Sequence, residues 1–261
     1  MTVALQRLVG TAYDRAALAL ARSADPIVYR SLAGPLVDAV VDALGSRASP
    51  VLDVAAGAGA FGRAFERVVA VDISVGQLLA NPTPDRARAE AAHLPFRDDA
   101  FAAVGCAFGI NHLVDPAPAV RDMARVAPVV AVSTWAHPEV PYAPKRIVQA
   151  AFERHAGSSR SPLGVALDDL AGRIGSVRAV HKLFADAGMQ PSVREVVVEI
   201  PWMGLDAFLD YRLAMPSSPL VTSRAALRAE VADAIAGLSP DELSWHPRVV
   251  IGVGHRRPDP M

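Results

Sequence analysis

Residues 51–72 contain the pattern that most constrains the fold of this chain. Two short runs of apolar and β-branched residues, 51–54 and 68–71, flank a glycine-rich turn. Such runs are typical of strands buried in a parallel sheet, and glycine lets the chain turn tightly and lets a ligand approach the backbone. Residues 63–67 indicate a short helix between the turn and the second strand. This order predicts one half of a doubly wound α/β fold, in which ligands bind at the carboxyl ends of the strands.

The glycines leave two kinds of nucleotide ligand to be compared. Gly57, Gly59 and Gly62 satisfy the G-x-G-x-x-G pattern of dinucleotide sites. Asp53, however, lies four residues before Gly57, where a negative charge favours a ligand that carries a cation over a pyrophosphate. Asp72 follows Gly62 by only ten residues, whereas the dinucleotide pattern places its acid about 20 residues further on. An NAD-dependent oxidoreductase therefore stays as an alternative, although the positions of Asp53 and Asp72 both argue against it.

The segment from Asp53 to Gly59 resembles the first motif of the class I S-adenosylmethionine-dependent methyltransferases. That motif is usually D-x-G-x-G-x-G, and here Ala55 stands in place of its first glycine. Asp72 and Ile73 resemble the end of the family's second strand, whose acid holds both ribose hydroxyls. A carboxylate suits this role because it offers two acceptor oxygens. The short connection to Asp72 predicts a first helix of about two turns.

Two later segments extend the resemblance, which spans about residues 13–132. Residues 90–96 resemble the family's D-A-x-x-L-P-F segment, with Glu90 where Asp is usual. The resemblance implies that Glu90 accepts the adenine amino group, that the backbone of Ala91 meets a ring nitrogen, and that Phe108 lies against the methionine part. The implied site for S-adenosylmethionine comprises Asp53, Ala55, Gly57, Gly59, Asp72, Ile73, Glu90, Ala91 and Phe108.

His112 is the candidate catalytic residue, because it follows the fourth predicted strand and the resemblance places it close to the methyl group. An imidazole with a pKa near 6.5 can take a proton from a hydroxyl or an acidic carbon at neutral pH. The other interpretation is that His112 caps the next helix or forms part of the pocket wall. Both interpretations stay open from the sequence.

The resemblance implies a Rossmann-like, doubly wound sheet of seven strands in the order 3-2-1-4-5-7-6, with the last strand antiparallel. We expect a core at 48–135 and 181–261, with a helical lid over the substrate at 136–180. Residues 1–47 are expected to be helices that close over the cofactor. Within them, Asp25 is expected to cap a helix that has Pro26 at its first position, and Gly45 predicts a helix end.

Aromatic and histidine side chains supply the candidate wall of a substrate site. Tyr13 and Tyr29 belong to the helices that would close over the cofactor, and Trp135 and His137 lie at the start of the expected lid. Each could contact the substrate or could pack as ordinary support. Further candidates of the same kind are Tyr142, Phe152 and His155.

The composition excludes several other function classes. The 261 residues include 26 basic and 27 acidic side chains, a net charge of −1, so there is no electrostatic case for a nucleic-acid or acidic-membrane partner. Cys106 is the single cysteine, which predicts a reducing, cytoplasmic location without intrachain disulfides. No apolar run approaches a membrane span, no signal peptide is expected, and the sequence lacks the common metal-site, nucleophile-elbow and P-loop patterns.

The resemblance and the composition together predict a methyltransferase that acts on an O, N or C atom of a small, partly apolar molecule. Enzymes of this type include the ubiquinone and menaquinone methyltransferases and those that tailor natural products. A protein that binds S-adenosylmethionine without transferring its methyl group is a second alternative beside the oxidoreductase. Nothing in the sequence names the acceptor.

Overall fold

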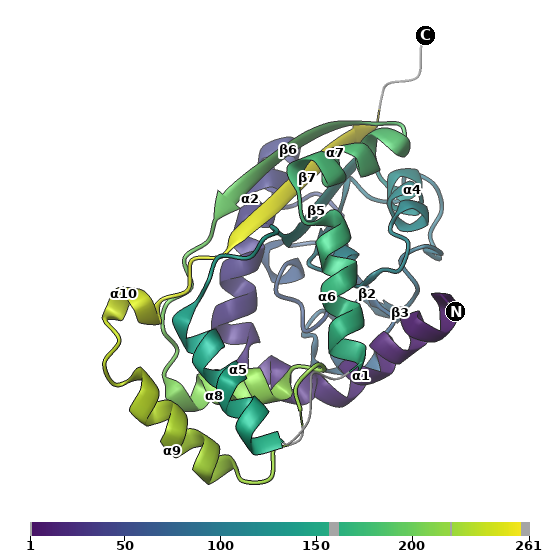
Figure 1. Cartoon of the computed structure of the whole chain (residues 1–261). Helices are drawn as coiled ribbons and strands as arrows, with labels where there is room; N and C mark the ends of the chain where they lie inside the picture. The colour runs from purple at the N-terminus through teal and green to yellow at the C-terminus, as the bar shows by residue number, and fades with distance from the viewer. Residues whose placement is uncertain (1, 157–161, 220, 257–261) are drawn as a thin grey trace.

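The computed structural model, which describes residues 2–156, 162–219 and 221–256, contains one seven-stranded sheet with helices on both faces (Figure 1). The strand order is β3-β2-β1-β4-β5-β7-β6, and β7 alone runs antiparallel to both of its neighbours. This confirms the predicted order and orientation. The strands are β1 (Val51–Val54), β2 (Val68–Asp72), β3 (Arg86–Arg88), β4 (Ala103–Ala107), β5 (Val129–Trp135), β6 (Met189–Val197) and β7 (Arg248–Arg256).

Alternate residues of the central strands enter two separate hydrophobic cores. Val51 packs with residues of helix α2 (Arg30–Leu44), whereas its neighbour Leu52 packs on the opposite face. Helices α4 (Ala117–Val126) and α7 (Val177–Asp186) cover that second face. Because both faces are covered, these strands are continuous apolar runs.

Two local predictions near the N-terminal half were wrong. The π-helix η1 (Asp25–Tyr29) starts at Asp25 with Ala24 in the capping position, so Asp25 belongs to the helix and does not precede it. The first helix after the glycine turn is only the three-residue 3₁₀ helix η2 (Gly62–Ala64). It ends early because Phe65 is already extended and buries its ring against Phe61. The predicted helix end at Gly45 is confirmed by its left-handed φ of 65°.

Four helices gather at one end of the molecule, away from the sheet (Figure 1). They are α5 (Ala143–Ala156), α8 (Leu205–Ala214), α9 (Arg224–Ile235) and α10 (Pro240–Leu243). Arg154 and His155 of α5 pair with Glu230 of α9, and the Tyr142 hydroxyl donates to the Leu243 carbonyl at 2.7 Å. Helices from two separate parts of the chain therefore form one layer.

The remaining helices lie closer to the carboxyl edge of the sheet. Helix α1 (Thr2–Ser23) packs against α3 (Val75–Ala80), and α6 (Pro162–Ile174) packs against the 3₁₀ helix η3 (Ile110–His112). In the described part of the chain, no helix has the length and apolar character needed to cross a membrane.

Candidate active site

A cavity of about 550 Å³ lies at the carboxyl edge of β1, β2 and β4. Its walls come from the segments that follow β1, β2, β3 and β4. Residues of α1, the N-terminal helix, complete the lining. Ligands of doubly wound folds bind at this edge, and the volume is within the roughly 300–1,000 Å³ of sites for small molecules.

The turn after β1 has an unusual backbone. Ala55, Gly57 and Gly59 have φ angles of 54°, 52° and 87°, in the left-handed region that favours glycine. Gly59 also has no room for a side chain, because a Cβ there would lie 2.7 Å from Asn81 Oδ1. The turn places the backbone of Ala55 and Gly57 along the cavity wall.

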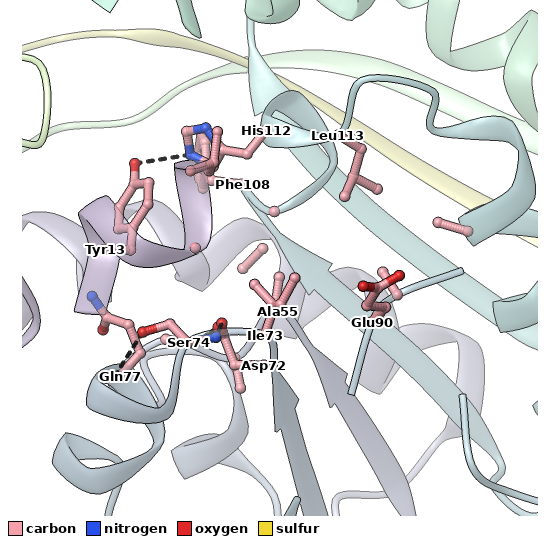
Figure 2. Close-up of a pocket in the computed structure, with 18 of the residues that line it drawn as sticks. Tyr13, Ala55, Asp72, Ile73, Ser74, Gln77, Glu90, Phe108, His112 and Leu113 are labelled. Carbon is pink, nitrogen blue, oxygen red and sulfur yellow. Dashed lines mark hydrogen bonds between the residues drawn. The ribbon is translucent and has the colours of Figure 1, made fainter. Parts of the chain in front are cut away.

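Asp72 ends β2 with its carboxylate at the cavity wall (Figure 2). Its Oδ2 accepts the Gly57 N–H at 2.9 Å, and its Oδ1 accepts the Ser74 N–H at 2.8 Å. Burial raises the pKa of this carboxyl group, and the backbone N–H groups of Ser74, Gly57 and Ile73 oppose that shift. A carboxylate has about four acceptor positions, so each oxygen keeps one for a ligand.

Asp53 and Gly59 were expected in the cofactor site, yet among the described residues neither lines the cavity. Asp53 is 1% exposed, and its Oδ2 accepts the Gly62 N–H at 3.0 Å underneath the turn. Burial raises its pKa to about 8. In this structure Asp53 holds the turn, and its attraction for a ligand cation stays a prediction.

The other expected cofactor residues come together. Ile73, Glu90, Ala91 and Phe108 all line the same cavity as Asp72, although they follow three different strands. Figure 2 shows Glu90 and Ile73 on the same wall region as Ala55 and Asp72. The topology brings the carboxyl ends of parallel strands to one edge, which is why separate motifs meet here.

His112 lies in η3 and contacts Tyr13 of α1 (Figure 2). The Tyr13 hydroxyl and His112 Nε2 are 3.1 Å apart, and Asn111 Nδ2 lies 3.2 Å from the same nitrogen. With the Asn111 amide oriented as in this structure, Nε2 accepts, because an NH₂ group can only donate. Burial lowers the pKa of His112 to about 4 and raises that of Tyr13. His112 is therefore neutral at physiological pH, with its proton on Nδ1.

The candidate substrate residues divide between two cavities. Tyr29 lines the large cavity, whereas Trp135 and His137 line a second one of about 180 Å³, and Tyr13 lines both. Phe152 also lines the second cavity. Tyr142 and His155 line neither, because their polar groups bond within the helical layer.

Three residues that the sequence analysis did not single out support the large cavity. Ser74 Oγ accepts the Gln77 N–H at 3.1 Å, which caps α3, and both residues line the cavity. Asp14 of α1 accepts the Ser74 hydroxyl at 2.6 Å and the Gly76 N–H at 2.8 Å. The cap at Ser74 could have been predicted, because a serine directly before an apolar helix is typical of a helix cap. The contact from Asp14 could not, because it joins segments 60 residues apart in the sequence.

Comparison with known proteins finds similarity to methyltransferases over part of the chain. Residues 52–128 match the family model described as "Methyltransferase domain". The demethylmenaquinone methyltransferase of Paenarthrobacter aurescens is 35% identical over 114 residues, which are 39% of this chain and 45% of that protein. Both matches are to methyltransferases, and each covers less than half of this chain. The match covers less than half the length of that relative.

Solved structures support the fold of this chain over a longer span. A SAM-dependent methyltransferase from Thermotoga maritima has a TM-score of 0.55 at 14% identity, covering 95% of this chain and 99% of that one. The [4+2]-cyclase SpnF has a TM-score of 0.54 at 16% identity, covering 97% of both chains. At these identities the likeness concerns the fold alone, and chemistry has to be argued from the site.

Proposed function

We propose that this protein is a methyltransferase that binds S-adenosylmethionine in the large cavity and transfers its methyl group to an O, N or C atom of a small, partly apolar molecule. One observation supports this most: Asp72 lines the cavity with both oxygens oriented by backbone N–H groups and with acceptor positions remaining. The two hydroxyls of a ribose match those positions. The residues present therefore fit the cofactor that the family uses.

The other cavity residues have assignable roles in this proposal. Glu90 would accept the adenine amino group, Ile73 would pack against the adenosine, and Phe108 would pack against the methionine part. When bound, S-adenosylmethionine supplies a methyl group made electrophilic by its sulfonium sulfur. With the cofactor held by these residues, an acceptor atom with a lone pair would take the methyl group, the carbon–sulfur electrons would stay on sulfur, and the acceptor would lose a proton. Alignment of the two reactants is the protein's main contribution.

The curated relatives suggest a class of acceptor. Several are named demethylmenaquinone methyltransferases, so a quinone-type molecule is the first acceptor to test. His112 would act as a general base only if its Nε2 is released from Tyr13 and Asn111, because both groups contact that nitrogen. Otherwise it forms the wall beside the methyl group.

Calorimetric titration with S-adenosylhomocysteine tests the cofactor site. Asp72→Asn should weaken binding by about 10- to 100-fold, because charge-assisted hydrogen bonds contribute about 1.5–3 kcal/mol. Asp85→Asn, at an exposed loop position, serves as the control and should leave affinity within twofold. Unchanged affinity in the Asp72 variant would exclude this ribose assignment.

Two further outcomes separate the alternatives. Binding of NADH without binding of S-adenosylhomocysteine would favour the oxidoreductase. Binding of S-adenosylhomocysteine without transfer of labelled methyl to any member of a phenol, quinol and amine panel would favour a protein that binds the cofactor for another purpose.

A further inference from the structure

Gln77 of α3 is a nearly buried polar side chain whose amide has no visible role in the fold. It is 6% exposed and lines the large cavity, on the wall that carries Ser74 and Asp72 (Figure 2). Its backbone N–H bonds Ser74 Oγ, but within the described chain its side-chain amide has no hydrogen-bond partner. Buried polar groups nearly always have a partner, so this amide indicates a ligand that bonds to it.

The amide of Gln77 is accessible from the cavity. Among the described residues, the polar atoms that are both fully buried and without a partner belong to other side chains. The amide oxygen and nitrogen of Gln77 therefore keep some accessible surface, and the cavity that this residue lines supplies it. Gln77 Oε1 lies 3.6 Å from the position that a Cβ on Gly57 would occupy. This places the amide beside the Gly57 residue that donates to Asp72.

The surrounding structure does not need this amide. Gly57 donates its N–H to Asp72 Oδ2 at 2.9 Å, and its carbonyl accepts a hydrogen bond from Asn81 Nδ2 at 3.0 Å. Ser74 caps α3 through the backbone of Gln77 and not through its side chain. Apolar packing does not require glutamine either, because a methionine would fill a similar volume without burying a polar group. A ligand is therefore the remaining partner for the amide.

A ribose held by Asp72 has a requirement that Gln77 can meet. Each ribose hydroxyl has one hydrogen, and once that hydrogen is donated to a carboxylate, the hydroxyl oxygen can only accept. Donors close to Asp72 are already used, because the N–H groups of Gly57 and Ser74 bond the carboxylate. The Ser74 hydroxyl donates to Asp14. The side-chain NH₂ of Gln77 offers two hydrogens at this wall.

We propose that Gln77 is a specificity-determining residue of the large cavity, and that its side-chain NH₂ donates to the oxygen of a ribose hydroxyl whose hydrogen bonds Asp72. The proposal rests on the proposed function, because it takes the large cavity as the site of the adenosyl ligand. Asp72 and Gln77 together then recognise one hydroxyl as a donor and as an acceptor. A ligand without that hydroxyl loses two hydrogen bonds, whereas a carboxylate alone would lose one.

The test compares S-adenosylhomocysteine with its 2′-deoxy and 3′-deoxy analogues by calorimetric titration of the full chain. In the wild type, the analogue that lacks the doubly bonded hydroxyl should bind more weakly than the other analogue. Gln77→Met keeps the length of the side chain without its amide, and it should weaken S-adenosylhomocysteine by about three- to tenfold. It should bind the weaker analogue within twofold of the wild type, because that analogue has no oxygen for the amide.

A matched control and a second substitution keep the test decisive. Gln190→Met removes an exposed glutamine of β6, and it should change neither the affinity for S-adenosylhomocysteine nor the preference between the analogues. Gln77→Ala also removes the amide and favours a helix. It replaces the methionine variant if thermal melting shows that variant to be unfolded, and it should reduce the preference between the analogues to the same extent.

The outcomes distinguish this inference from the proposed function. If the Gln77 variants keep the wild-type affinity for S-adenosylhomocysteine or the wild-type preference between the analogues, the inference is overturned while cofactor binding stands. A lowered melting temperature with an unchanged preference also overturns it, because a packing role predicts that pattern. Failure of the wild-type chain to bind S-adenosylhomocysteine would overturn the proposed function, and the role of Gln77 would fall with it.

Discussion

Ala55 stands where the methyltransferase motif usually has glycine, and it nevertheless adopts a left-handed φ of 54°. Such a conformation costs an L-residue about 1–2 kcal/mol. The space for its methyl group comes from Gly109, where a Cβ would lie 2.4 Å from Ala55 Cβ. The departure from the motif is therefore accommodated by a neighbouring glycine and leaves the turn intact.

Replacing this alanine should stabilise the protein. Ala55→Gly removes about 1–2 kcal/mol of backbone strain from the folded state. Glycine also raises the conformational entropy of the unfolded chain, which lowers stability by about 0.4–1 kcal/mol. The net gain in the free energy of unfolding should be about 0.5–1 kcal/mol. Urea denaturation would measure it. Ala56→Gly is the matched control, because Ala56 is outside the positive-φ residues of the described chain, and it should lower stability. A loss of stability in both variants would refute the strain argument.

The low pKa of His112 predicts how kcat/KM should depend on pH. If His112 is the base, it must be neutral to accept a proton. Its pKa of about 4 means that it loses this ability only below about pH 4, whereas an ordinary histidine loses it below about pH 6.5. The pH dependence of kcat/KM should therefore be flat from about pH 5 to pH 8, and His112→Gln should lower kcat by about 100-fold. A decline centred near pH 6.5 would show that the ring is solvated during turnover.

At the scale of elements, one carboxylate fastens the N-terminal helix over the site. Asp14 of α1 bonds both the Ser74 hydroxyl and the Gly76 N–H at the start of α3, and these bonds together with the neighbouring Arg88 lower its pKa despite some desolvation. Gln6, Gly10 and Tyr13 of the same helix line the cavity. Docking of α1 and closure of the cavity are therefore coupled.

Asp14→Ala should loosen this helix. The lost capping bonds are worth about 1–2 kcal/mol, so amide hydrogen exchange in α1 should quicken about 5- to 30-fold, and S-adenosylhomocysteine should dissociate faster. Asp38→Ala, on the exposed side of α2, should change neither property. Unaltered exchange in the Asp14 variant would mean that apolar packing alone holds α1.

At the scale of the whole molecule, burial of Asp53 should make stability depend on pH. Its folded pKa of about 8 exceeds its unfolded value near 3.9, so the folded state favours the protonated form. The contribution of this carboxyl group to the free energy of unfolding is fully present below about pH 4 and is lost as the pH rises through about 8. Compared with Asp53→Asn, the wild type should lose free energy of unfolding between pH 5 and pH 9. Parallel curves for the two proteins would contradict a buried, titrating carboxyl group.

The sequence predicted what depends on local pattern and on strand order. Residues 51–54 and 68–71 form the two expected strands, and the separate motifs at Asp72, Glu90 and Phe108 meet at one cavity. It did not predict the second cavity, where Arg212 and Trp245 arrive from a segment assigned to the core. Tertiary packing of the helical layer brings those residues there, and no local periodicity encodes it.

The division into a core and a lid at 136–180 stays a prediction, and the structure adds a reason to revise its boundary. Helices α5 and α9 pack together although the sequence division separates them. If the layer moves over the acceptor, both segments have to move as one unit.

A crystal structure of the chain with S-adenosylhomocysteine tests the central claim most directly. We predict the adenosine in the cavity between α1 and the carboxyl edge, with both ribose hydroxyls about 2.5–3.0 Å from the Asp72 carboxylate oxygens. An adenosine bound elsewhere, or a ribose that leaves Asp72 without contact, would contradict the account.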